Sequence, residues 1–415
     1  MTPEIKQRIE QICRGEVPEG YKKGKLGIVP EEWNETSFST LFTSTSDYTD
    51  DLKKYPLYSL TIEDGITPKT ERYERSHLVK KEDSYKIVMP NDYAYNPMNL
   101  RFGAVARHKG DMPVAVSGYY DIFTTVHESD LPFMDSFLTC GPMITYYNRV
   151  STGSLVEKQR VHFSQFLEFV LPLPSINERT KIAAILTTQD KVIELKEKRL
   201  AQKQRQKKHL MQQLLTGRKR LPGFNGTWKT DRLGKLFFER KETNCENLEM
   251  LAITGTQGII PRKELDLKDN SSEDKSKYLR VCVGDIGYNT MRMWQGVSAY
   301  SNYEGIVSPA YTILKPSSSI NAKYFAYLFK MPEIIFLFYR FSQGLVDDTR
   351  NLKYENFKKI KVCYPPDMKE QTAIAEVLST ADHEIDLLQQ DIEQEKQKKK
   401  ALMQLLLTGI VRVKT

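Results

Sequence analysis

The sequence predicts an α+β protein: two related α/β domains are joined by two long helices that form an antiparallel coiled coil. The first observation behind this fold class is an internal repeat, in which residues 174–217 and 366–409 share 20 identities in 44 positions without a gap. The second is a seven-residue period of apolar side chains inside both of these segments. The order along the chain is therefore domain, helix, domain, helix.

The regions between the helices repeat more faintly. Trp33 and Trp228 each precede a Leu-Phe pair at the same interval, and Tyr95-Asn96-x-Met98 matches Tyr288-Asn289-x-Met291. The repeat therefore extends over both globular regions. We divide the chain into an N-terminal segment with a first domain (1–168), a first spacer helix (169–218), a second domain (219–360), and a second spacer helix with a C-terminal tail (361–415).

The seven-residue period is typical of a coiled coil rather than of an isolated surface helix. Lysine interrupts it at equivalent places, where we expect weaker pairing or a packed partner. Glycine stops the helices at Gly217 and Gly409. The alternative is two amphipathic helices that each pack on their own domain. The positions in register are Leu186, Ile193, Leu200, Lys207 and Leu214 in the first segment and Leu378, Ile385, Ile392, Lys399 and Leu406 in the second.

Chain topology predicts antiparallel helices, because the second helix leaves the second domain with only the first helix to pair with. This arrangement returns residues 410–415 to the first domain. About forty helical residues make a rod of roughly 60 Å. The two domains would then be separated by more than one turn of DNA, which is about 34 Å, and this suits two half-sites on one duplex.

The charge balance favours a polyanionic partner, because 61 Lys and Arg residues against 53 Asp and Glu residues give a net charge of +8. Five scattered cysteines without a CxxC spacing support neither a disulfide framework nor a zinc site. The longest apolar run, 334–338, is too short to span a bilayer, and the N-terminus is charged where a signal peptide is apolar. We therefore expect a cytoplasmic protein without membrane contact.

Turn-rich segments at 91–120 and 284–311 concentrate side chains that are suited to reading DNA. Arginine can fork onto guanine, Asn or Gln onto adenine, and aromatic rings can pack against sugars or an unstacked base. The alternative for each segment is a solvated loop with half-buried rings. The candidate DNA-binding residues are Asn96, Arg101, Arg107, Lys109, Tyr119 and Tyr120 in the first domain and Asn289, Arg292, Trp294, Gln295, Ser308, Tyr311 and Arg350 in the second.

The helices and their flanks resemble the specificity subunits of type I restriction-modification enzymes. Both copies carry the motif LP-x-x-x-E-Q/R-x-x-I-A-x-x-L in closely similar form at the helix start and LMQ-x-L-L-T-G at its end, and GIVSPAY at 305–311 matches a recurrent stretch of that family. The first copy departs at Arg179, where the second has Gln371, and it has SGYYDIF in place of GIVSPAY. The helix starts are Leu171-Pro172 to Glu178-Arg179 and Pro365-Pro366 to Glu370-Gln371, and the ends are 210–217 and 402–409.

The resemblance implies a non-catalytic DNA reader. Each target-recognition domain would read one half of a bipartite, asymmetric target in double-stranded DNA, and the coiled coil would set the gap. Two methylation subunits that bind S-adenosylmethionine would dock on the helices, and restriction subunits that use ATP and Mg would join them, whereas this chain would bind no cofactor or metal. The residues expected to bind the partners are Glu178, Arg179, Leu214, Leu215, Glu370, Gln371, Leu406 and Leu407.

Two other classes remain open, a DNA-processing enzyme of the type II restriction kind and a stand-alone coiled-coil scaffold. A methyltransferase that stacks a flipped base needs a D/N-P-P-Y/F tetrad, but Asn96-Pro97-Met98 has a single proline. Asp231, Glu239 and Lys241 could form a magnesium nuclease site, but the first copy does not repeat them. A scaffold would leave two basic, aromatic domains unexplained. Mutating the basic loop of one domain distinguishes a scaffold from a DNA reader, because only the function of a DNA reader depends on that loop.

Overall fold

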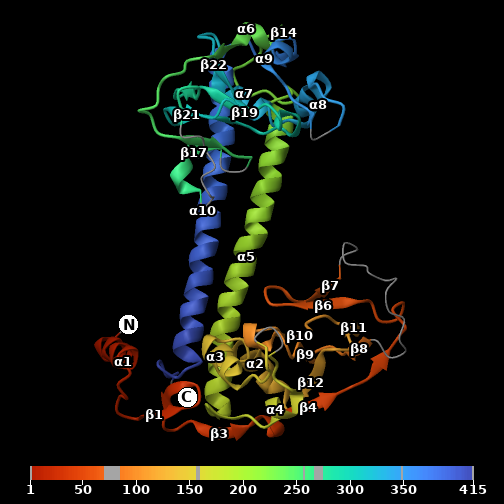
Figure 1. Ribbon diagram of the computed structural model, residues 1–415, viewed down its shortest axis with the longest axis vertical. Coiled ribbons are helices and arrows are strands. Elements are labelled where there is room, and N and C mark those ends of the chain that lie inside the picture. The colour runs from red at the N-terminus through yellow and green to blue at the C-terminus, as the bar shows by residue number, and fades with distance from the viewer. Residues whose placement is uncertain are drawn as a thin grey trace. The chain divides into compact units, whose positions relative to one another are not determined.

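The computed structural model describes residues 2–69, 85–155, 159–255, 258–265, 274–346 and 349–413. The chain divides into two compact units (Figure 1). Unit 1 contains Met1–Lys196 and Asp391–Thr415, and unit 2 contains Glu197–Gln390. Each unit therefore combines one globular region with parts of both long helices. Within the described ranges, no helix has the length and apolarity that a membrane crossing requires.

The globular region of unit 1 is a set of small antiparallel sheets. Its strands are β1 (Tyr21–Gly24), β2 (Gly27–Pro30), β3 (Asn34–Ser37), β4 (Phe42–Thr45), β5 (Tyr48–Thr49), β6 (Tyr58–Thr61), β7 (Gly65–Pro68), β8 (Tyr85–Val88), β9 (Tyr93–Tyr95), β10 (Val105–Arg107), β11 (Val114–Ser117), β12 (Asp121–Thr125) and β13 (Val170–Leu173). The largest sheet has the order β10-β9-β12-β4, and the others are β11-β8-β5, β13-β3, β1-β2 and β6-β7.

Short helices accompany these sheets. They are α1 (Pro3–Cys13), η1 (Phe38–Thr40), η3 (Leu100–Phe102), η4 (Glu128–Asp130), α2 (Leu131–Phe137), α3 (Gly141–Val150) and α4 (Phe163–Leu167). All of them except α1, which has no buried residue, contribute to or border an aromatic core. Phe123 lies at the centre of the core, stacked on Tyr93 with ring centroids 5.2 Å apart and 5.3 Å from Phe166. Such contacts between buried rings stabilise the core beyond the burial of their area.

Unit 2 is built on the same plan. Its strands are β14 (Lys229–Arg232), β15 (Phe237–Arg240), β16 (Leu251–Ile253), β17 (Ile259–Pro261), β18 (Leu279–Val281), β19 (Ile286–Asn289), β20 (Ser298–Tyr300), β21 (Gly305–Val307), β22 (Tyr311–Pro316) and β23 (Lys361–Tyr364). Its short helices are α6 (Leu233–Leu236), η6 (Arg262–Glu264), η7 (Met293–Gln295), α7 (Ala322–Leu328), α8 (Pro332–Phe341) and α9 (Tyr354–Phe357).

The sheet orders show that the internal repeat is structural. The order β20-β19-β22-β15 in unit 2 corresponds strand by strand to β10-β9-β12-β4 in unit 1. The β14-β23 pair likewise corresponds to β3-β13, and the helices α7 and α8 correspond to α2 and α3. The predicted fold class, two repeated α/β regions with long helices, is therefore confirmed.

The long helices α5 (Ile176–Leu214) and α10 (Met368–Leu406) pack together as the sequence predicts (Figure 1). In unit 1, Lys196 Nζ lies 2.8 Å from Asp391 Oδ1, and Lys399 Nζ lies 2.6 Å from Asp190 Oδ1. As the numbering rises along α5 from Asp190 to Lys196, the facing position on α10 falls from Lys399 to Asp391, so the two helices are antiparallel. The buried seam positions include Leu186, Ile193, Leu214, Leu378, Ile385, Ile392 and Leu406.

Unit 2 also contains ion pairs between α5 and α10. Lys203 Nζ lies 2.6 Å from Glu384 Oε2, and Lys207 pairs with Asp382. Lys207 and Lys399, which interrupt the apolar period, are thus matched by aspartates of the opposite helix at equivalent positions. Exposed pairs of this kind stabilise by only about 0.2–1 kcal/mol each. Their larger effect is on register and helix direction, because a shifted register would leave a lysine in the seam without its carboxylate.

The end of each long helix is built into a globular core. Leu214, the last residue of α5, and Leu215 after it belong to the core of unit 2, and Leu406, the last residue of α10, and Leu407 after it belong to that of unit 1. The segment after α10 stays in unit 1, where Arg8 Nη1 of α1 donates to the carbonyl oxygen of Ile410 at 3.0 Å. The predicted return of the C-terminal segment to the first domain is therefore confirmed.

Candidate nucleic-acid interface

A buried tyrosine followed by an asparagine turn occurs in both units. Tyr95 and Tyr288 are fully buried in β9 and β19. Asn96 Oδ1 then accepts the backbone N–H of Met98 at 3.1 Å, and Asn289 Oδ1 accepts that of Met291 at 3.0 Å. An asparagine that bonds the backbone two residues ahead forms an Asx turn. Both predicted DNA-binding asparagines therefore shape the loop that follows them.

The backbone of the loop that follows has the same course in both units. A single 3-10 turn follows, η3 in unit 1 and η7 in unit 2, with a buried apolar residue, Leu100 or Met293, at its start. Each turn ends at a glycine with positive φ, 92° at Gly103 and 79° at Gly296. A Cβ on Gly296 would also come within 2.8 Å of Ile335 Cδ1. Backbone conformation and close packing therefore both require glycine there.

The outward positions of this loop differ between the units. Asn99, Arg101 and Phe102 in unit 1 correspond to Arg292, Trp294 and Gln295 in unit 2. Phe102 is 49% exposed, and Arg292 and Gln295 are exposed as well. The residues that build the loop are thus shared, and those that face solvent are not.

Unit 2 presents donors and rings beside its loop. Neither Arg292 nor Gln295 has a side-chain hydrogen bond to another described residue. Trp294 Nε1 donates to the carbonyl oxygen of Met291 at 2.9 Å, and its ring meets Tyr339 edge-on with centroids 6.3 Å apart. Arg350 lies 4.1 Å over the Tyr339 ring and donates to its hydroxyl at 2.9 Å. The structure therefore brings Arg292, Trp294, Gln295 and Arg350 to one loop region.

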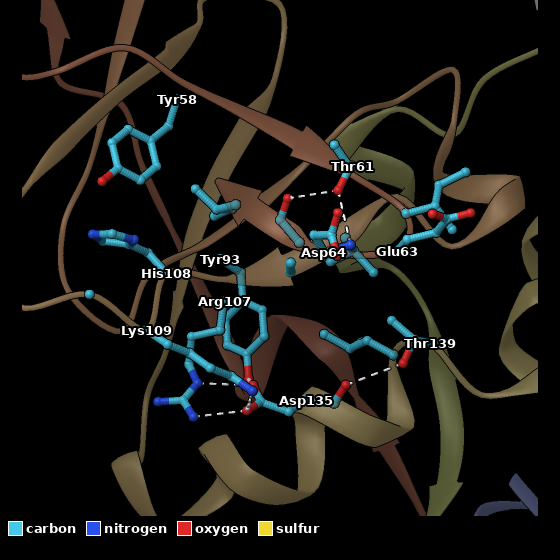
Figure 2. A pocket seen from close by; sticks show the side chains of 17 residues that line it. Tyr58, Thr61, Glu63, Asp64, Tyr93, Arg107, His108, Lys109, Asp135 and Thr139 are labelled. Carbon is cyan, nitrogen blue, oxygen red and sulfur yellow. Dashed lines mark hydrogen bonds and ion pairs between the residues drawn. The ribbon is translucent and has the colours of Figure 1, made fainter. Parts of the chain in front are cut away.

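Unit 1 has a hollow of about 410 Å³ between the β6-β7 hairpin and the β9-β10 pair (Figure 2). The candidate residues Arg107 and Lys109 line it. Arg107 forms a two-point ion pair with Asp135, with distances of 2.9 and 2.8 Å, and its Nη1 donates to Asn91 Oδ1 at 2.6 Å. Lys109 Nζ lies 3.2 Å from the same Asp135 carboxylate but is 68% exposed. Arg107 is therefore held in place, whereas Lys109 can reach outward.

The Asp135 carboxylate organises this hollow. Burial opposes its ionisation, but the hydrogen bonds of Arg107 and the charges of Lys109 and Arg107 outweigh burial and hold the pKa of Asp135 below its ordinary value. The Tyr93 hydroxyl donates to Asp135 Oδ1 at 2.8 Å. Burial, followed by the charge of Asp135, raises the pKa of Tyr93. The hollow therefore presents a fixed carboxylate, a neutral phenol and an outward ammonium.

The remaining candidates lie on neighbouring strands or turns. Tyr119 is exposed, and Tyr120 is half-buried against Val88 and Val116 of the smaller core. Ser308 Oγ accepts the backbone N–H of Ala310 at 3.4 Å, and half-buried Tyr311 starts β22. In unit 1, Arg101 lies 4.5 Å over the Phe102 ring and donates to Gln159 at 3.2 Å.

Buried ion pairs fix the starts of the long helices. In unit 1, Glu178 accepts two hydrogen bonds from Arg412, with distances of 2.8 and 3.0 Å. In unit 2, Glu370 accepts two from Arg220, with distances of 2.5 and 2.7 Å. Both glutamate side chains are only 2% exposed. The start of each long helix is therefore tied to the segment that follows the end of the other.

Arg179 and Gln371 occupy equivalent positions, and the groups that they bond also differ between the units. Arg179 donates to Asp130 Oδ1 at 2.9 Å and to a proline carbonyl in unit 1. In unit 2, Gln371 Oε1 accepts the backbone N–H of Asn321 at 2.8 Å, and its Nε2 donates to a proline carbonyl. Asp130 precedes α2 and Asn321 precedes the equivalent α7. An ion pair between two side chains in unit 1 is thus replaced in unit 2 by a hydrogen bond from the backbone of Asn321 to the Gln371 amide.

All eight residues expected to bind partner subunits are buried within the chain. They are Glu178, Arg179, Leu214, Leu215, Glu370, Gln371, Leu406 and Leu407, and none is more than 8% exposed. Their contacts hold each globular region on both helices. Their predicted role in docking stays a prediction, and the described contacts give them a structural role.

The carboxylates of the nuclease alternative are engaged by cations. Glu239 lies 3.0 Å from Lys241 Nζ, and Asp231 lies 3.3 Å from Lys235 Nζ. The hydrogen bonds of Lys235 and Tyr364 hold the pKa of Asp231 below its ordinary value. In the part of the chain that the structure describes, no three or more His, Cys, Asp or Glu side chains come together as metal ligands.

Comparison with known proteins shows what this chain is similar to. Residues 233–397 match the type I restriction modification DNA specificity domain. Over 439 aligned positions the chain is 24% identical to a protein of Methanocaldococcus jannaschii named for the specificity subunit of the type I restriction enzyme MjaX, and the match covers 96% of this chain and 98% of the relative. This chain is therefore similar to type I restriction-modification specificity subunits.

Solved specificity subunits share the fold. A type I S subunit from M. genitalium matches 90% of this chain and 96% of its own length, with a TM-score of 0.54 and 13% identity. A structure titled for complex assembly and conformational transition of the type I R-M system matches 92% of this chain and 99% of its own length, with a TM-score of 0.53 and 13% identity. The architecture of type I specificity subunits is therefore that of this chain.

Several residues that organise this specificity-subunit fold were not expected from the sequence. Arg220 and Arg412 carry the helix-start ion pairs, Asp135 holds Arg107, and Tyr339 supports Arg350. The arginines could have been found, because they lie 192 residues apart and so extend the repeat beyond Gly217 and Gly409. Asp135 and Tyr339 carry no such signal in the sequence.

Proposed function

We propose that this chain is the sequence-reading subunit of a type I restriction-modification complex, and that each unit reads one half of a bipartite DNA target. The observation that supports this proposal is the loop built twice on shared Asn, Met and Gly positions with different outward side chains. A shared scaffold presents the loop to DNA in a similar way, and different tips select different bases. An asymmetric target follows, because the two tips are unlike.

Unit 2 carries the better-defined reading chemistry. The guanidinium of Arg292 matches the two acceptors of a guanine edge, and the amide of Gln295 matches the donor and acceptor of adenine. Arg350 is suited to binding a phosphate, because the Tyr339 ring orients its planar guanidinium, whose geometry matches that of a phosphate group. In unit 1, Lys109 is the outward cation, whereas Arg107 positions the site through Asp135.

We propose that the coiled coil sets the gap between the half-sites and docks two methylation subunits. Exposed apolar residues support two equal docking sites. Leu195 is 64% exposed on α5 and its repeat mate Leu387 is 50% exposed on α10, while Ile176 and Met368 form a second such pair at 59% and 40%. Repeated exposed apolar positions suit two copies of one partner. Docking would then use the outward faces of the helices rather than the buried motif residues.

In this proposal the chemistry belongs to the partners. S-adenosylmethionine would be held by the methylation subunits, and ATP with Mg by the restriction subunits. The chain itself binds and orients DNA, with affinity from phosphate contacts and discrimination from the two loops.

The test is a methylome. The chain is expressed with its neighbouring methylation subunit in a host without other adenine methylation, and N6-methyladenine is mapped by single-molecule sequencing. We expect two short defined halves around a fixed gap, with one adenine modified on each strand. Modification without a split motif, or none from a soluble pair that purifies together, would contradict the proposal.

A matched pair of variants assigns the halves. Arg292→Ala with Gln295→Ala should relax the bases of one half-site and leave the other unchanged. Lys323→Ala removes an exposed cation on α7 of the same unit and should leave both halves intact. Both half-sites unchanged in the double variant would mean that this loop does not read bases.

A further inference from the structure

Unit 2 has an open hollow whose counterpart in unit 1 is filled. The hollow measures about 470 Å³ and is lined by Arg232, Leu337, Phe341, Lys359 and Lys361. Its apolar floor comes from one face of α8, since Leu337 and Phe341 are four residues apart. Its cations are Arg232 at the end of β14, Lys361 at the start of β23, and Lys359 two residues before β23.

The repeat identifies the equivalent place in unit 1. The β14-β23 pair corresponds to β3-β13, with Arg232 opposite Lys361 in the register where Ser37 lies opposite Val170. By the same alignment, Leu337 and Phe341 of α8 correspond to Tyr146 and Val150 of α3, and Lys359 corresponds to Glu168. The equivalent place in unit 1 therefore lacks the three cations.

The tip of the β1-β2 hairpin lies at that place in unit 1. Lys25 Nζ donates to the carbonyl oxygen of Val170 at 2.9 Å, and Arg149 at the end of α3 donates to the carbonyl oxygen of Lys25 at 2.7 Å. The neighbouring Leu26 packs on the hydrophobic core of the unit. A two-residue hairpin tip thus puts an apolar side chain on the core and a cation at the rim.

Unit 2 has no such hairpin. Residues 218–227 connect α5 to β14, all of them are described, and none is in a strand. Leu221 does pack on the core, but the repeat pairs it with Val413, which packs on the core of unit 1 in the same way. The place that Leu26 occupies in unit 1 is therefore left open in unit 2.

The charge at the rim points to the chemistry of an occupant. Arg232 and Lys361 lie directly opposite each other on paired strands, and like charges so placed repel. Neither these two residues nor Lys359 forms an ion pair with a carboxylate in the described part of the chain. A second copy of the β1-β2 hairpin would be repelled, because that hairpin carries Lys22 and Lys23 in β1 and Lys25 at its tip.

We propose that this hollow binds an acidic segment of a partner protein, which places an apolar side chain on Leu337 and Phe341 and carboxylates on the three cations. A protein segment fits better than DNA, because the equivalent place holds a hairpin tip and the floor is apolar. The hollow also lies away from the proposed reading loop: Leu337 and Tyr339 are two positions apart on α8, about 200° around a helix. The proposal is separate from DNA reading and stands or falls independently of it.

The probe is a cyclised ten-residue peptide with the sequence of residues 21–30 and the changes Lys22→Glu, Lys23→Glu and Lys25→Glu. Its fluorescence anisotropy is titrated with the full chain, and the unchanged peptide is the control. We expect the acidic peptide to bind and the unchanged one to bind at least about tenfold more weakly. Equal binding of the two peptides, or binding of neither, would overturn the proposal.

Variants of the chain locate the site. Arg232→Glu with Lys361→Glu should weaken the acidic peptide by about tenfold or more, and Arg232→Gln with Lys361→Gln should weaken it less while keeping side-chain shape. Lys323→Glu changes net charge outside the hollow and should have no effect. Affinity for duplex DNA, measured on the same variants, should be unchanged. If DNA affinity falls together with its salt dependence while peptide binding does not change, the cations face phosphates and the proposal is wrong.

Discussion

The ion pair between Glu370 and Arg220 predicts an unequal cost for removing its two members. The glutamate side chain is 2% exposed and the arginine side chain 26%, and Arg220 keeps a hydrogen bond to the carbonyl oxygen of Gly226 at 2.9 Å. Arg220→Met leaves a buried carboxylate without a partner, which costs about 3–5 kcal/mol. Glu370→Leu leaves an arginine that still reaches water, so we expect about 1–3 kcal/mol.

The double variant should recover much of the loss. Replacing both members of a buried ion pair by apolar groups is often close to neutral, so Arg220→Met with Glu370→Leu should lie within about 1–2 kcal/mol of the parent. Hydrogen exchange of the amides in the first turns of α10, read by mass spectrometry on the full chain, measures these free energies locally. Circular dichroism during urea unfolding gives the overall change.

The equivalent pair in unit 1 serves as an independent repeat of the experiment. Glu178 and Arg412 have side-chain exposures of 2% and 33%, so Arg412→Met should again cost more than Glu178→Leu. Additive losses in the double variants, or a glutamate replacement that costs more than its arginine replacement in both units, would refute the reasoning from burial.

Three further predictions concern charges. Arg179→Gln with Asp130→Asn introduces the residue types of Gln371 and Asn321 from unit 2 and should change stability by less than about 1.5 kcal/mol in urea unfolding, whereas Arg179→Gln alone should cost about 3 kcal/mol. A hydrogen bond from Lys196 lowers the pKa of Glu395 to about 2 from 4.5, so the stability it adds is complete above pH 4.5 and is lost as the pH falls toward 2; helical circular dichroism should show this, and Glu395→Gln should remove that response. Lys330→Met removes two hydrogen bonds, of 2.7 and 2.6 Å, to backbone carbonyls between η7 and the start of β20, so hydrogen exchange there should accelerate about tenfold and one half-site should lose base preference.

The fold could be predicted from the sequence because its signals are repeated or periodic. The long helices follow from the seven-residue period, and antiparallel pairing follows from the order of the elements. The matched tyrosine and asparagine positions, Tyr95-Asn96 and Tyr288-Asn289, mark the same turn in both units. Short strands such as β5 and β21 give much weaker signals, because two or three residues do not make a pattern.

The candidate site was harder to predict, because pairings between distant residues leave no local signal. Glu178 meets Arg412 across 234 positions, and only the fold brings them together. A motif at a helix start resembles a docking surface in the sequence, yet Glu370 and Gln371 are at most 1% exposed. The candidate arginines differ for the same reason, since Arg107 is held by Asp135 but Arg292 is not held by any described carboxylate.

The proposed spacing role of the coiled coil leads to a deletion that the ion pairs define. Lys196 faces Asp391 in unit 1 and Lys203 faces Glu384 in unit 2, and both pairs of numbers add to 587. Removing 197–203 together with 384–390 therefore deletes one heptad from each helix without shifting the remaining pairs.

Seven residues span about 10 Å, so the tolerated gap should shorten by about three base pairs. A heptad turns a helix by only about 20° from its starting face, whereas three base pairs turn DNA by roughly 100° at about 10.5 base pairs per turn. We therefore expect methylation of the shortened target to be weaker than that of the parent, because the DNA must twist to present both halves. Deleting 197–203 alone shifts the pairs out of register and should destabilise the helices. An unchanged gap in the double deletion, or altered half-sites, would mean that the coiled coil does not set the spacing.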